Sequence, residues 1–196
     1  MHNSHMMQSE LFVGAVAAKP LGLKYEPDFL CAQEETQLLA LIRGLPFQEA
    51  QYKEWHARRR IVSFGGRYDF TRHQLNEAPP IPEFLLPLRK RIARFANVTP
   101  EEIQHAMVAE YQPATPLGWH RDVPDFDVIM GVSLLGQARL RFRPWPSPPH
   151  ARCTLAIELA PRSAYVLRDE ARWHWQHAVS PTKELRYSIT FRTRRA

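Results

Sequence analysis

The sequence predicts an α+β protein in which helices of the first half pack against an antiparallel β core formed by the second half. Before about residue 104, two stretches carry apolar residues at helical spacing, whereas beyond it short runs alternate apolar and polar residues. Six or seven such runs, separated by proline-rich turns, are typical of a β sandwich or a jelly roll. A length of 196 residues and a hydrophobic content of 44% fit one globular domain.

Two segments of the first half are predicted to be helices. Residues 27–46 begin near Asp28, carry acidic residues in their first half and stop at Gly44. The apolar residues expected on the buried side of this helix are Leu38, Leu41, Ile42 and Leu45. A second helix follows the sequence APPIPEF and runs to about Phe95. The residues expected on its buried side are Leu85, Leu88, Ile92 and Phe95. Between the helices, RRRIVSFGGRYDF (58–70) predicts two strands around a Gly-Gly turn.

The strands expected from residue 104 onward are HAMVAEYQ, DVIMGVSLL, ARLRFRP, CTLAIELA, SAYVLRD, WHWQHAV and LRYSITFR. In the last run, one face is apolar or aromatic (Leu185, Tyr187, Ile189 and Phe191) and the other is polar (Arg186, Ser188, Thr190 and Arg192). A solvent-exposed face would explain this pattern without any function. A strand late in a jelly roll can be covered on both faces, however, and a covered arginine needs an anionic partner such as a carboxylate.

Termini and cysteines give expectations about domain organisation and location. Residues 1–7, MHNSHMM, resemble an expression tag, and we expect residues 8–196 to form a single domain. The apolar run 11–18 is too short to span a membrane and is predicted to be a buried strand, with a signal peptide as the alternative. Cys31 and Cys153 are far apart and lack metal-type spacing, so we expect a reducing, cytoplasmic location. We also expect a monomer with no membrane partner.

The chain is basic, with a formal net charge of +6 and a pI near 9.6. Arginine clusters occur at 57–60, 89–94, 139–143 and 191–196. Such a charge favours polyanionic partners, single-stranded nucleic acid among them, through counterion release. Solvated arginine faces on an ordinary basic protein explain the composition equally well.

One constellation of residues indicates a metal site. His120 and Asp122 lie two apart at an expected strand end, so their side chains point the same way and form either an ion pair or part of a metal site. His177 follows Trp173 and Trp175 on one face of an expected strand, whereas His174 faces the opposite way. His177 is either a packing or hydrogen-bonding residue among the tryptophans or the third ligand of the metal site. Two histidines and one carboxylate form the facial triad of non-haem Fe(II) oxygenases, which leaves coordination positions for an oxo-acid and O2. A hydrolytic zinc site can use the same ligands but leaves the paired arginines unexplained.

From about Tyr25 to Arg194, the sequence resembles the AlkB-like Fe(II)/2-oxoglutarate dioxygenases. The motifs that carry the resemblance are Tyr111 nine residues before His120, the HAVSP around His177, and RYSITFR with its arginines six apart. The segments RRRIVSFGGRYDF and PPIPEFLLPL are also similar to AlkB homologues that act on RNA. The resemblance implies a double-stranded β-helix (jelly roll) core with N-terminal helices packed on it, and an enzyme that uses Fe(II), 2-oxoglutarate and O2.

The resemblance also implies a role for each matching residue. By this resemblance, the iron ligands would be His120, Asp122 and His177. Arg186 would bind the distal carboxylate of 2-oxoglutarate. Arg192 would lie near the metal end of the cosubstrate, and Tyr111 would form a hydrogen bond to it. Ligand histidines must be neutral to coordinate a metal, and each is expected to donate its other N–H to an acceptor.

Three positions depart from the family pattern. Ala109 and Ser188 stand where the family usually has asparagines, so two amide contacts to 2-oxoglutarate are absent or reduced, with Ser188 kept as a candidate contact. Pro124, followed by Asp125, stands where DNA-repair members carry a base-contacting aspartate. The family's base recognition therefore does not transfer to this sequence.

The implied reaction is oxidative demethylation or hydroxylation of alkylated nucleobases in DNA or RNA, with release of succinate, CO2 and formaldehyde. The candidate substrate contacts are Trp55, Arg58, Arg59, Arg60, Tyr68 and Trp119. Aromatic residues of 52–70, namely Tyr52, Trp55, Tyr68 and Phe70, either stack a flipped base or pack the strands onto the helices. The arginines 58–60 are either phosphate contacts or a solvated edge, and Trp119 is expected to be a pocket wall.

Two other functions remain open on the sequence alone. The first is a dioxygenase of the same chemistry that acts on a protein side chain or a small molecule, which the missing base-contacting aspartate favours. The second is a non-enzymic nucleic-acid-binding module with a relic metal site, which Ala109 and Ser188 favour. Succinate production separates the second function from the enzymes, and salt-sensitive binding to single strands separates nucleic-acid substrates from the first.

Overall fold

The computed structural model describes residues 19–195, apart from 53–54, 70–73 and 148–154. The tag-like residues 1–7, the apolar run 11–18, Phe70 and Cys153 lie outside the described residues. The side chains of Tyr52, Trp55 and Arg58 are also outside the described part, although their backbones are not.

The described residues form β1 (Leu23–Glu26), α1 (Ala32–Ile42), β2 (Gln48–Tyr52), β3 (Trp55–Phe64), β4 (Arg67–Asp69), β5 (Gln74–Asn76), a short 3-10 helix η1 (Glu83–Leu85), α2 (Leu86–Ala96) and β6 (Ile103–Tyr111). The remaining elements are β7 (Leu117–His120), β8 (Phe126–Leu134), β9 (Ala138–Pro144), β10 (Leu155–Leu159), β11 (Ala164–Leu167), α3 (Asp169–Trp173), β12 (Trp175–Val179) and β13 (Arg186–Arg194).

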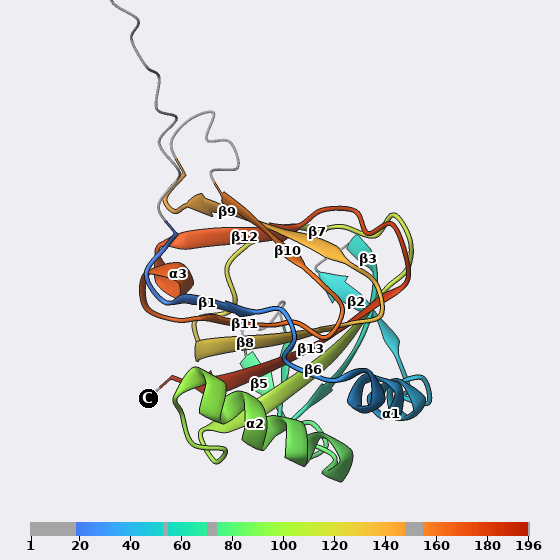
Figure 1. The fold of residues 1–196 in the computed structure, drawn as a ribbon. Helices are drawn as coiled ribbons and strands as arrows, with labels where there is room; N and C mark the ends of the chain where they lie inside the picture. Colours follow the sequence, from blue (N-terminus) through green and yellow to red (C-terminus); the bar gives the residue numbers. More distant parts are fainter. Residues whose placement is uncertain (1–18, 53–54, 70–73, 148–154, 196) are drawn as a thin grey trace, which may run out of the picture.

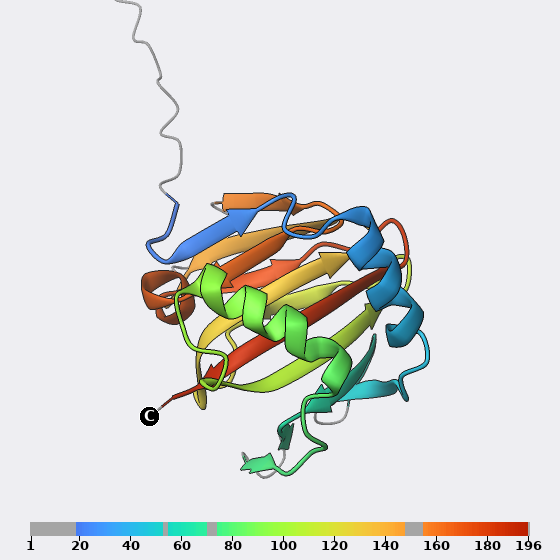
Figure 2. The ribbon, with the colours of Figure 1, turned by 60° about the horizontal axis from the view of Figure 1, so that its bottom comes forward.

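Two antiparallel sheets form the core of the molecule (Figure 1). The major sheet has seven strands in the order β1-β11-β8-β13-β6-β3-β2, and the minor sheet has four in the order β10-β9-β12-β7. From β7 to β13 the chain passes back and forth between the two sheets, apart from β9 and β10, which pair with each other in the minor sheet. This is the jelly-roll arrangement that the sequence predicted. Helices α1 and α2 lie across the outer face of the major sheet (Figure 2), so the predicted α+β class is confirmed.

The central strand β13 separates two buried regions. Tyr187, Ile189 and Phe191 are buried in the cluster that the helices form with the outer face of the major sheet. By strand alternation, Arg186 and Arg192 point the other way, into the space between the two sheets. Both faces of β13 are therefore covered, as expected, and polar side chains on its inner face need partners inside the molecule.

The first helix is shorter than predicted. It begins at Ala32 rather than near Asp28, because the backbone N–H of Cys31 donates to the carboxylate of Glu34 at 2.8 Å and caps the helix there. It ends at Ile42, two residues before Gly44. The residues buried on this helix are Leu38, Leu39 and Ile42, whereas Leu41, expected to be buried, is 51% exposed.

The second helix agrees with its prediction in position. The short 3-10 helix η1 leads directly into α2. Pro87 lies in the first turn of α2, where the missing backbone N–H of a proline costs no hydrogen bond. Leu85, Leu88 and Ile92 are buried against the sheet as predicted, and Phe95 is half-buried. The helix ends at Asn97 in the left-handed conformation (φ 56°), a common helix stop.

The Gly-Gly turn separates two strands, as predicted, but the strands do not pair with each other. β3 pairs with β2 and β6, whereas β4 pairs only with β5 in a separate two-stranded sheet. Gly65 has a φ of +76°, and a Cβ atom there would overlap the backbone carbonyl of Gln104. The turn therefore redirects the chain between sheets instead of closing a hairpin.

The predicted strand WHWQHAV begins two residues late. Asp169–Trp173 form the short helix α3, and His174 follows as its exposed C-terminal residue. Strand β12 starts at Trp175 and carries His177. The helix thus keeps His174 out of the site. Trp173 belongs to this helix, so the expectation that it shares a strand face with His177 is wrong.

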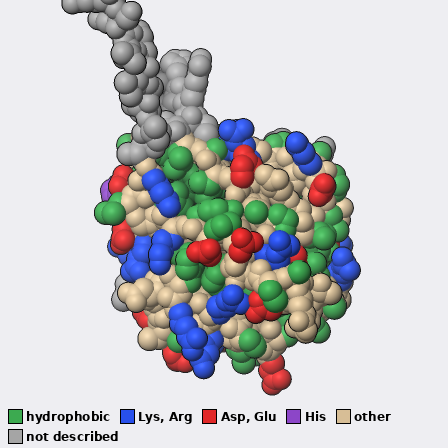
Figure 3. All heavy atoms as spheres, viewed as in Figure 1, with side chains coloured by type: hydrophobic (Ala, Val, Ile, Leu, Met, Phe, Trp, Pro, Cys, Tyr) green, Lys and Arg blue, Asp and Glu red, His purple; other side chains and the backbone are tan. Residues whose placement is uncertain are grey.

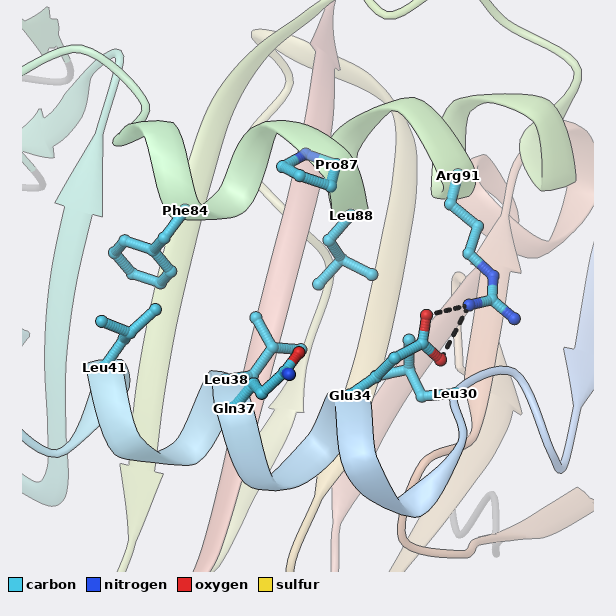
Figure 4. Close-up of a pocket in the computed structure, with 9 residues that line it drawn as sticks. All are labelled: Leu30, Glu34, Gln37, Leu38, Leu41, Phe84, Pro87, Leu88 and Arg91. Atoms are coloured by element: carbon cyan, nitrogen blue, oxygen red, sulfur yellow. Dashed lines mark hydrogen bonds and ion pairs between the residues drawn. The ribbon is translucent and has the colours of Figure 1, made fainter.

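A groove with a volume of about 300 Å³ lies between α1 and α2. In Figure 4, Leu41 faces Phe84 across this groove, and the Arg91–Glu34 ion pair, at 2.7 Å, closes its other end. Because the helices cover the outer face of the major sheet, the groove is separated by that sheet from the polar inner face of β13. It does not belong to the site described below.

The surface in Figure 3 mixes charges of both signs. Lysine and arginine side chains are interspersed with aspartate and glutamate on this face, so the positive excess is not gathered there into one basic patch. None of the described helices is long and apolar enough to cross a membrane.

Candidate functional site

The structure brings His120, Asp122 and His177 together between the sheets. His120 ends β7, Asp122 lies two residues further on, and His177 on the neighbouring strand β12 is the register partner of His120. The imidazole rings are 4.2 Å apart between centroids, and the candidate ligand atoms of all three residues lie within 4.8 Å of one another. The predicted facial triad is therefore assembled by one strand pair and one loop.

The protonation states of these residues suit a metal. Burial, followed by the neighbouring His120, lowers the pKa of His177 to about 3, and burial also lowers the pKa of His120. Both rings are therefore neutral at pH 7 and keep a lone pair for a metal. Burial would raise the pKa of Asp122, but the surrounding positive groups, of which the Arg192 guanidinium has the largest effect, together outweigh burial and hold that pKa well below its usual range.

The tautomer of His120 is set by the backbone. Its Nδ1 lies 2.9 Å from the carbonyl oxygen of Gly118, and a carbonyl only accepts, so Nδ1 carries the proton. The lone pair of Nε2 is then free to coordinate a metal. His177 Nε2 lies 3.5 Å from Oδ2 of Asp122, a contact between a neutral ring and a carboxylate rather than an ion pair, since His177 is uncharged.

Arg192 orients the carboxylate of the triad. Its Nε and Nη2 both donate to Oδ1 of Asp122, at 2.9 and 2.8 Å, which leaves Oδ2 directed to the histidines. Its Nη1 lies 3.2 Å from Nδ1 of His105, and burial lowers the pKa of His105 to about 3, so this ring is a neutral acceptor. Sequence reasoning missed His105. The signal that could have found it was the alternation of side chains along β6, which places His105 on the same face of its strand as Tyr111.

Arg186 lies at the other end of the same strand face without an anion. It is only 1% exposed, its Nε donates to Oγ of Ser133 at 2.9 Å, and its buried Nη1 has no hydrogen-bond partner. Among the described residues no carboxylate pairs with it. A buried guanidinium with a free N–H is costly unless an anion binds there.

Tyr111 lies beside Arg186 and beside a second arginine. It pairs in register with Arg186, whose guanidinium lies 5.0 Å from the centroid of its ring. Its hydroxyl accepts a hydrogen bond from Nη1 of Arg59 at 3.4 Å. Burial would raise the pKa of Tyr111, but the charges of Arg59 and Arg186 lower it overall.

A model of the 2OG-Fe(II) oxygenase superfamily matches residues 23–192. The chain belongs to this superfamily. The triad, the buried arginines and this match make it an Fe(II)/2-oxoglutarate-dependent dioxygenase, and His120, Asp122 and His177 are the residues that would hold its iron. The oxygenase is 29% identical over 191 residues to the uncharacterized protein L905 of Acanthamoeba polyphaga mimivirus, with 84% of this chain and 81% of that protein covered.

Further comparisons support an AlkB-like oxygenase, as the sequence motifs predicted. The chain is 28% identical over 183 residues to an alkylated DNA repair protein ALKBH8 homolog of Arabidopsis thaliana, covering 81% of this chain but only 50% of that longer protein. The fold is similar to OsALKBH1 (TM-score 0.73, 16% identity, 90% and 98% coverage) and to a Pseudomonas putida prolyl-4-hydroxylase (TM-score 0.60, 16% identity, 89% and 93% coverage).

The inner face of the oxygenase fits its cosubstrate. 2-Oxoglutarate is a dicarboxylate, and the unpaired, buried Nη1 of Arg186 would be a donor for the carboxylate remote from the metal. Ser188 lies between Ala109 and Ser133 in register, on the same face as Arg186. The row therefore offers the hydroxyl of Ser188, where the family usually has an asparagine, and the hydroxyl of Ser133, whereas Ala109 offers no polar group.

Tyr165 is a residue of the site that sequence reasoning missed. It lies on β11 opposite Gly131, and a Cβ atom at Gly131 would overlap its ring, so the phenol packs flat against the sheet. Burial raises the pKa of Tyr165 to about 12, against the opposing charge of Arg186 and with a smaller contribution from Asp122, so the phenol stays a neutral donor. Ala164–Leu167 has apolar or aromatic side chains on both of its sides, so the residue types of this strand did not indicate which side faces the interior.

The arginine triplet is divided by strand alternation. Arg59 points inward to Tyr111, whereas Arg60 points outward, where its Nη2 pairs with Glu110 at 2.7 Å. Arg58 and Trp55 lie on β3, with side chains outside the described part. Adjacent residues of a strand face opposite sides, so Arg59 and Arg60 do not share one surface, and a role of the triplet as phosphate contacts stays a prediction.

The other two predicted substrate contacts lie in different places. Tyr68, on β4, has its pKa raised by burial and then by the carboxylate of Asp125, in the loop that follows the iron ligand. Trp119 is not the pocket wall that was expected. Its ring lies 4.6 Å from the guanidinium of Arg143 and 5.1 Å from that of Arg141, on the outer side of the minor sheet.

Proposed function

We propose that this oxygenase demethylates or hydroxylates alkylated nucleobases in DNA or RNA. Bound Fe(II), with 2-oxoglutarate and O2, supplies oxidation of a C–H bond coupled to decarboxylation of 2-oxoglutarate to succinate. For an N-methyl base, the resulting hydroxymethyl group leaves as formaldehyde. The residues of the chain hold the metal, anchor the dicarboxylate at Arg186 and keep the histidine ligands neutral.

The similarity to a protein named for alkylated DNA repair, over 81% of this chain, carries the proposal. The net charge of +6 supports a polyanionic substrate. Inside the site, Arg59 adds a positive charge beside Tyr111, and its buried Nε has no hydrogen-bond partner in the described residues. This free donor is suited to a phosphate or a base edge.

The loop after Asp122 supports a base substrate whose recognition differs from that of DNA-repair members. Pro124 is exposed where those members carry an aspartate, and Asp125 follows, close enough to Tyr68 to affect its pKa. An aromatic ring for stacking and a carboxylate for an exocyclic amine are what a flipped base requires. We therefore include RNA bases among the proposed substrates.

A turnover assay that measures succinate and formaldehyde together tests this function. The wild-type oxygenase, Fe(II), 2-oxoglutarate and single strands of methylated DNA and RNA should release both products in equal amounts. His177→Ala should release neither. Succinate without formaldehyde on every strand, together with formaldehyde from methylated peptides or small amines, would assign the oxygenase to a different substrate class.

A further inference from the structure

The segment that carries the iron ligands has a second face. In β7 and β12, His120 and His177 pair in register, and His177 pairs in turn with the fully buried Phe142 of β9. These three side chains face the interior. Because successive side chains of a strand point to opposite sides, Trp119 and the arginines on either side of Phe142 lie on the outer face of the minor sheet.

On the outer face of the minor sheet, arginine guanidinium groups pack against tryptophan rings. Arg141 and Arg143 of β9 reach across β12 to Trp119 on β7, with guanidinium-to-ring distances of 5.1 and 4.6 Å. Ala178, opposite Arg141 in register, is small enough to let that side chain cross. At the end of the sheet, the guanidinium of Arg121 lies 5.1 Å from the ring of Trp145. We call Trp119, Arg121, Arg141, Arg143 and Trp145 the arginine–tryptophan face.

The positive charges of this face are not neutralised by described residues. Arg139, earlier on β9, pairs with Glu158 at 3.5 Å, but Arg121, Arg141 and Arg143 form no ion pair with any described residue. Arg143 donates only to the neutral amide of Gln176, at 2.7 Å, and Arg121 to a backbone carbonyl. Trp145 is 39% exposed. The face therefore combines three uncompensated charges with accessible aromatic surface.

The arginine–tryptophan face adjoins the iron site at an edge. β7 is the edge strand of the minor sheet, and Trp119 is the chain neighbour of His120, with Cα atoms about 3.8 Å apart. Helices α1 and α2 lie on the far side of the major sheet, so neither of them covers the outer face of the minor sheet (Figure 1). A flexible chain on this face can turn over β7 and reach the site.

We propose that the arginine–tryptophan face binds single-stranded nucleic acid and presents one nucleotide over the edge of β7 to the iron site. The inference rests on the proposed function and names the surface that serves it. Guanidinium groups bind phosphates through paired N–H donors, and indole rings stack on bases, so the two residue types together match a single strand. An acidic peptide would satisfy the arginines but leave the indole rings without flat partners.

Fluorescence anisotropy with labelled single strands of about 16 nucleotides tests the charges, because single modules cover up to about that length. In the wild type, affinity should fall with salt. The Arg141→Ala/Arg143→Ala variant should lower the salt slope by about 1.4, since each phosphate contact contributes about 0.7. Lys90→Ala/Arg94→Ala removes the same charge from exposed positions on α2, on the far side, and should leave the slope unchanged. Thermal melts check that each variant folds.

A second measurement tests the rings. Trp119→Ala should weaken binding on the order of 10- to 100-fold, and Trp119→Phe should retain most of it. A strand of the same length without bases should bind the wild type and Trp119→Ala equally, because no stacking is possible. Polyglutamate of matched charge should bind the wild type more weakly than the strand does.

The outcomes separate the surface from the function. Suppose that the wild type binds strands, but that Arg141→Ala/Arg143→Ala lowers the salt slope no more than Lys90→Ala/Arg94→Ala does, or not at all. The proposed surface would then be wrong, and the proposed substrate would stand. If the wild type binds no DNA or RNA strand even at low salt, the nucleic-acid function itself fails. Polyglutamate that binds as tightly as the strand, with no effect of Trp119→Ala, would assign the face to a protein partner instead.

Discussion

Arg192 donates two hydrogen bonds to the same oxygen of Asp122, at 2.9 and 2.8 Å, so that the other oxygen faces His177. The guanidinium thereby sets both the charge and the direction of the only acidic iron ligand of the triad. Residues that hold ligands in this way affect a metal site nearly as strongly as the ligands themselves.

Arg192→Lys should weaken metal binding about 10- to 100-fold, because an ammonium cannot hold one oxygen with two donors in a fixed plane. Anaerobic calorimetric titration with Fe(II), or with Mn(II) as a redox-stable substitute, measures the change. Arg194→Lys, at an exposed position two residues further on, is the matched control. Equal affinities of the two variants would show that the Asp122 contact does not support the metal.

The triad predicts a sharp contrast between two nearby histidines. His177→Ala should abolish metal-dependent turnover, because it removes a ligand that lies within 4.8 Å of the other two. His174→Ala should leave turnover near the wild-type level, since this residue is exposed at the end of α3. Metal content and succinate formation measure both, and loss of iron from His174→Ala alone would reverse the assignment.

Arg186→Ala should weaken 2-oxoglutarate binding by about ten- to a hundredfold, as expected when a charged hydrogen bond contributing about 1.5–3 kcal/mol is lost. Arg186→Lys should recover only part of the affinity. Arg60→Ala, whose guanidinium pairs with Glu110 on the opposite face, should leave it unchanged. Anaerobic titration of the metal-loaded protein reports the affinities, and wild-type affinity in Arg186→Ala would remove this residue from the cosubstrate site.

His105 should make the metal-free protein less stable in acid. Its pKa is lowered from 6.5 to about 3 in the folded state, so the unfolded chain binds a proton that the folded chain does not between these values. The stability is complete above about pH 6.5 and falls as the pH drops toward 3, by about 1.4 kcal/mol per pH unit for that proton.

Urea unfolding of the metal-free protein across this pH range measures the effect. His105→Gln keeps an acceptor for Arg192 but cannot take up the proton, so its stability should depend less steeply on pH. His174→Gln, at an exposed site, should retain the wild-type dependence. An unchanged slope in His105→Gln would mean that the other buried histidines account for the acid sensitivity.

Local patterns were sufficient for several of these features. The two-residue spacing of His120 and Asp122 predicted their common direction, and the alternation of 185–192 predicted the buried arginines. Local hydrogen bonding was harder to foresee, since the Cys31–Glu34 cap moved the start of α1. The helix before His174 also replaced an expected strand, because short aromatic runs have no single period that separates helix from strand.

The fold class, the residue types of the iron site and their relative sides on each strand follow from the residues alone. Which side faces inward, and what lies opposite each residue, depends on how the two sheets pack. This packing directed Arg59 to Tyr111 and Arg60 to Glu110, and it turned Trp119 away from the iron. The physical reason is that a two-residue period is a local property, whereas the partner of a side chain depends on pairing between strands that are far apart in the chain.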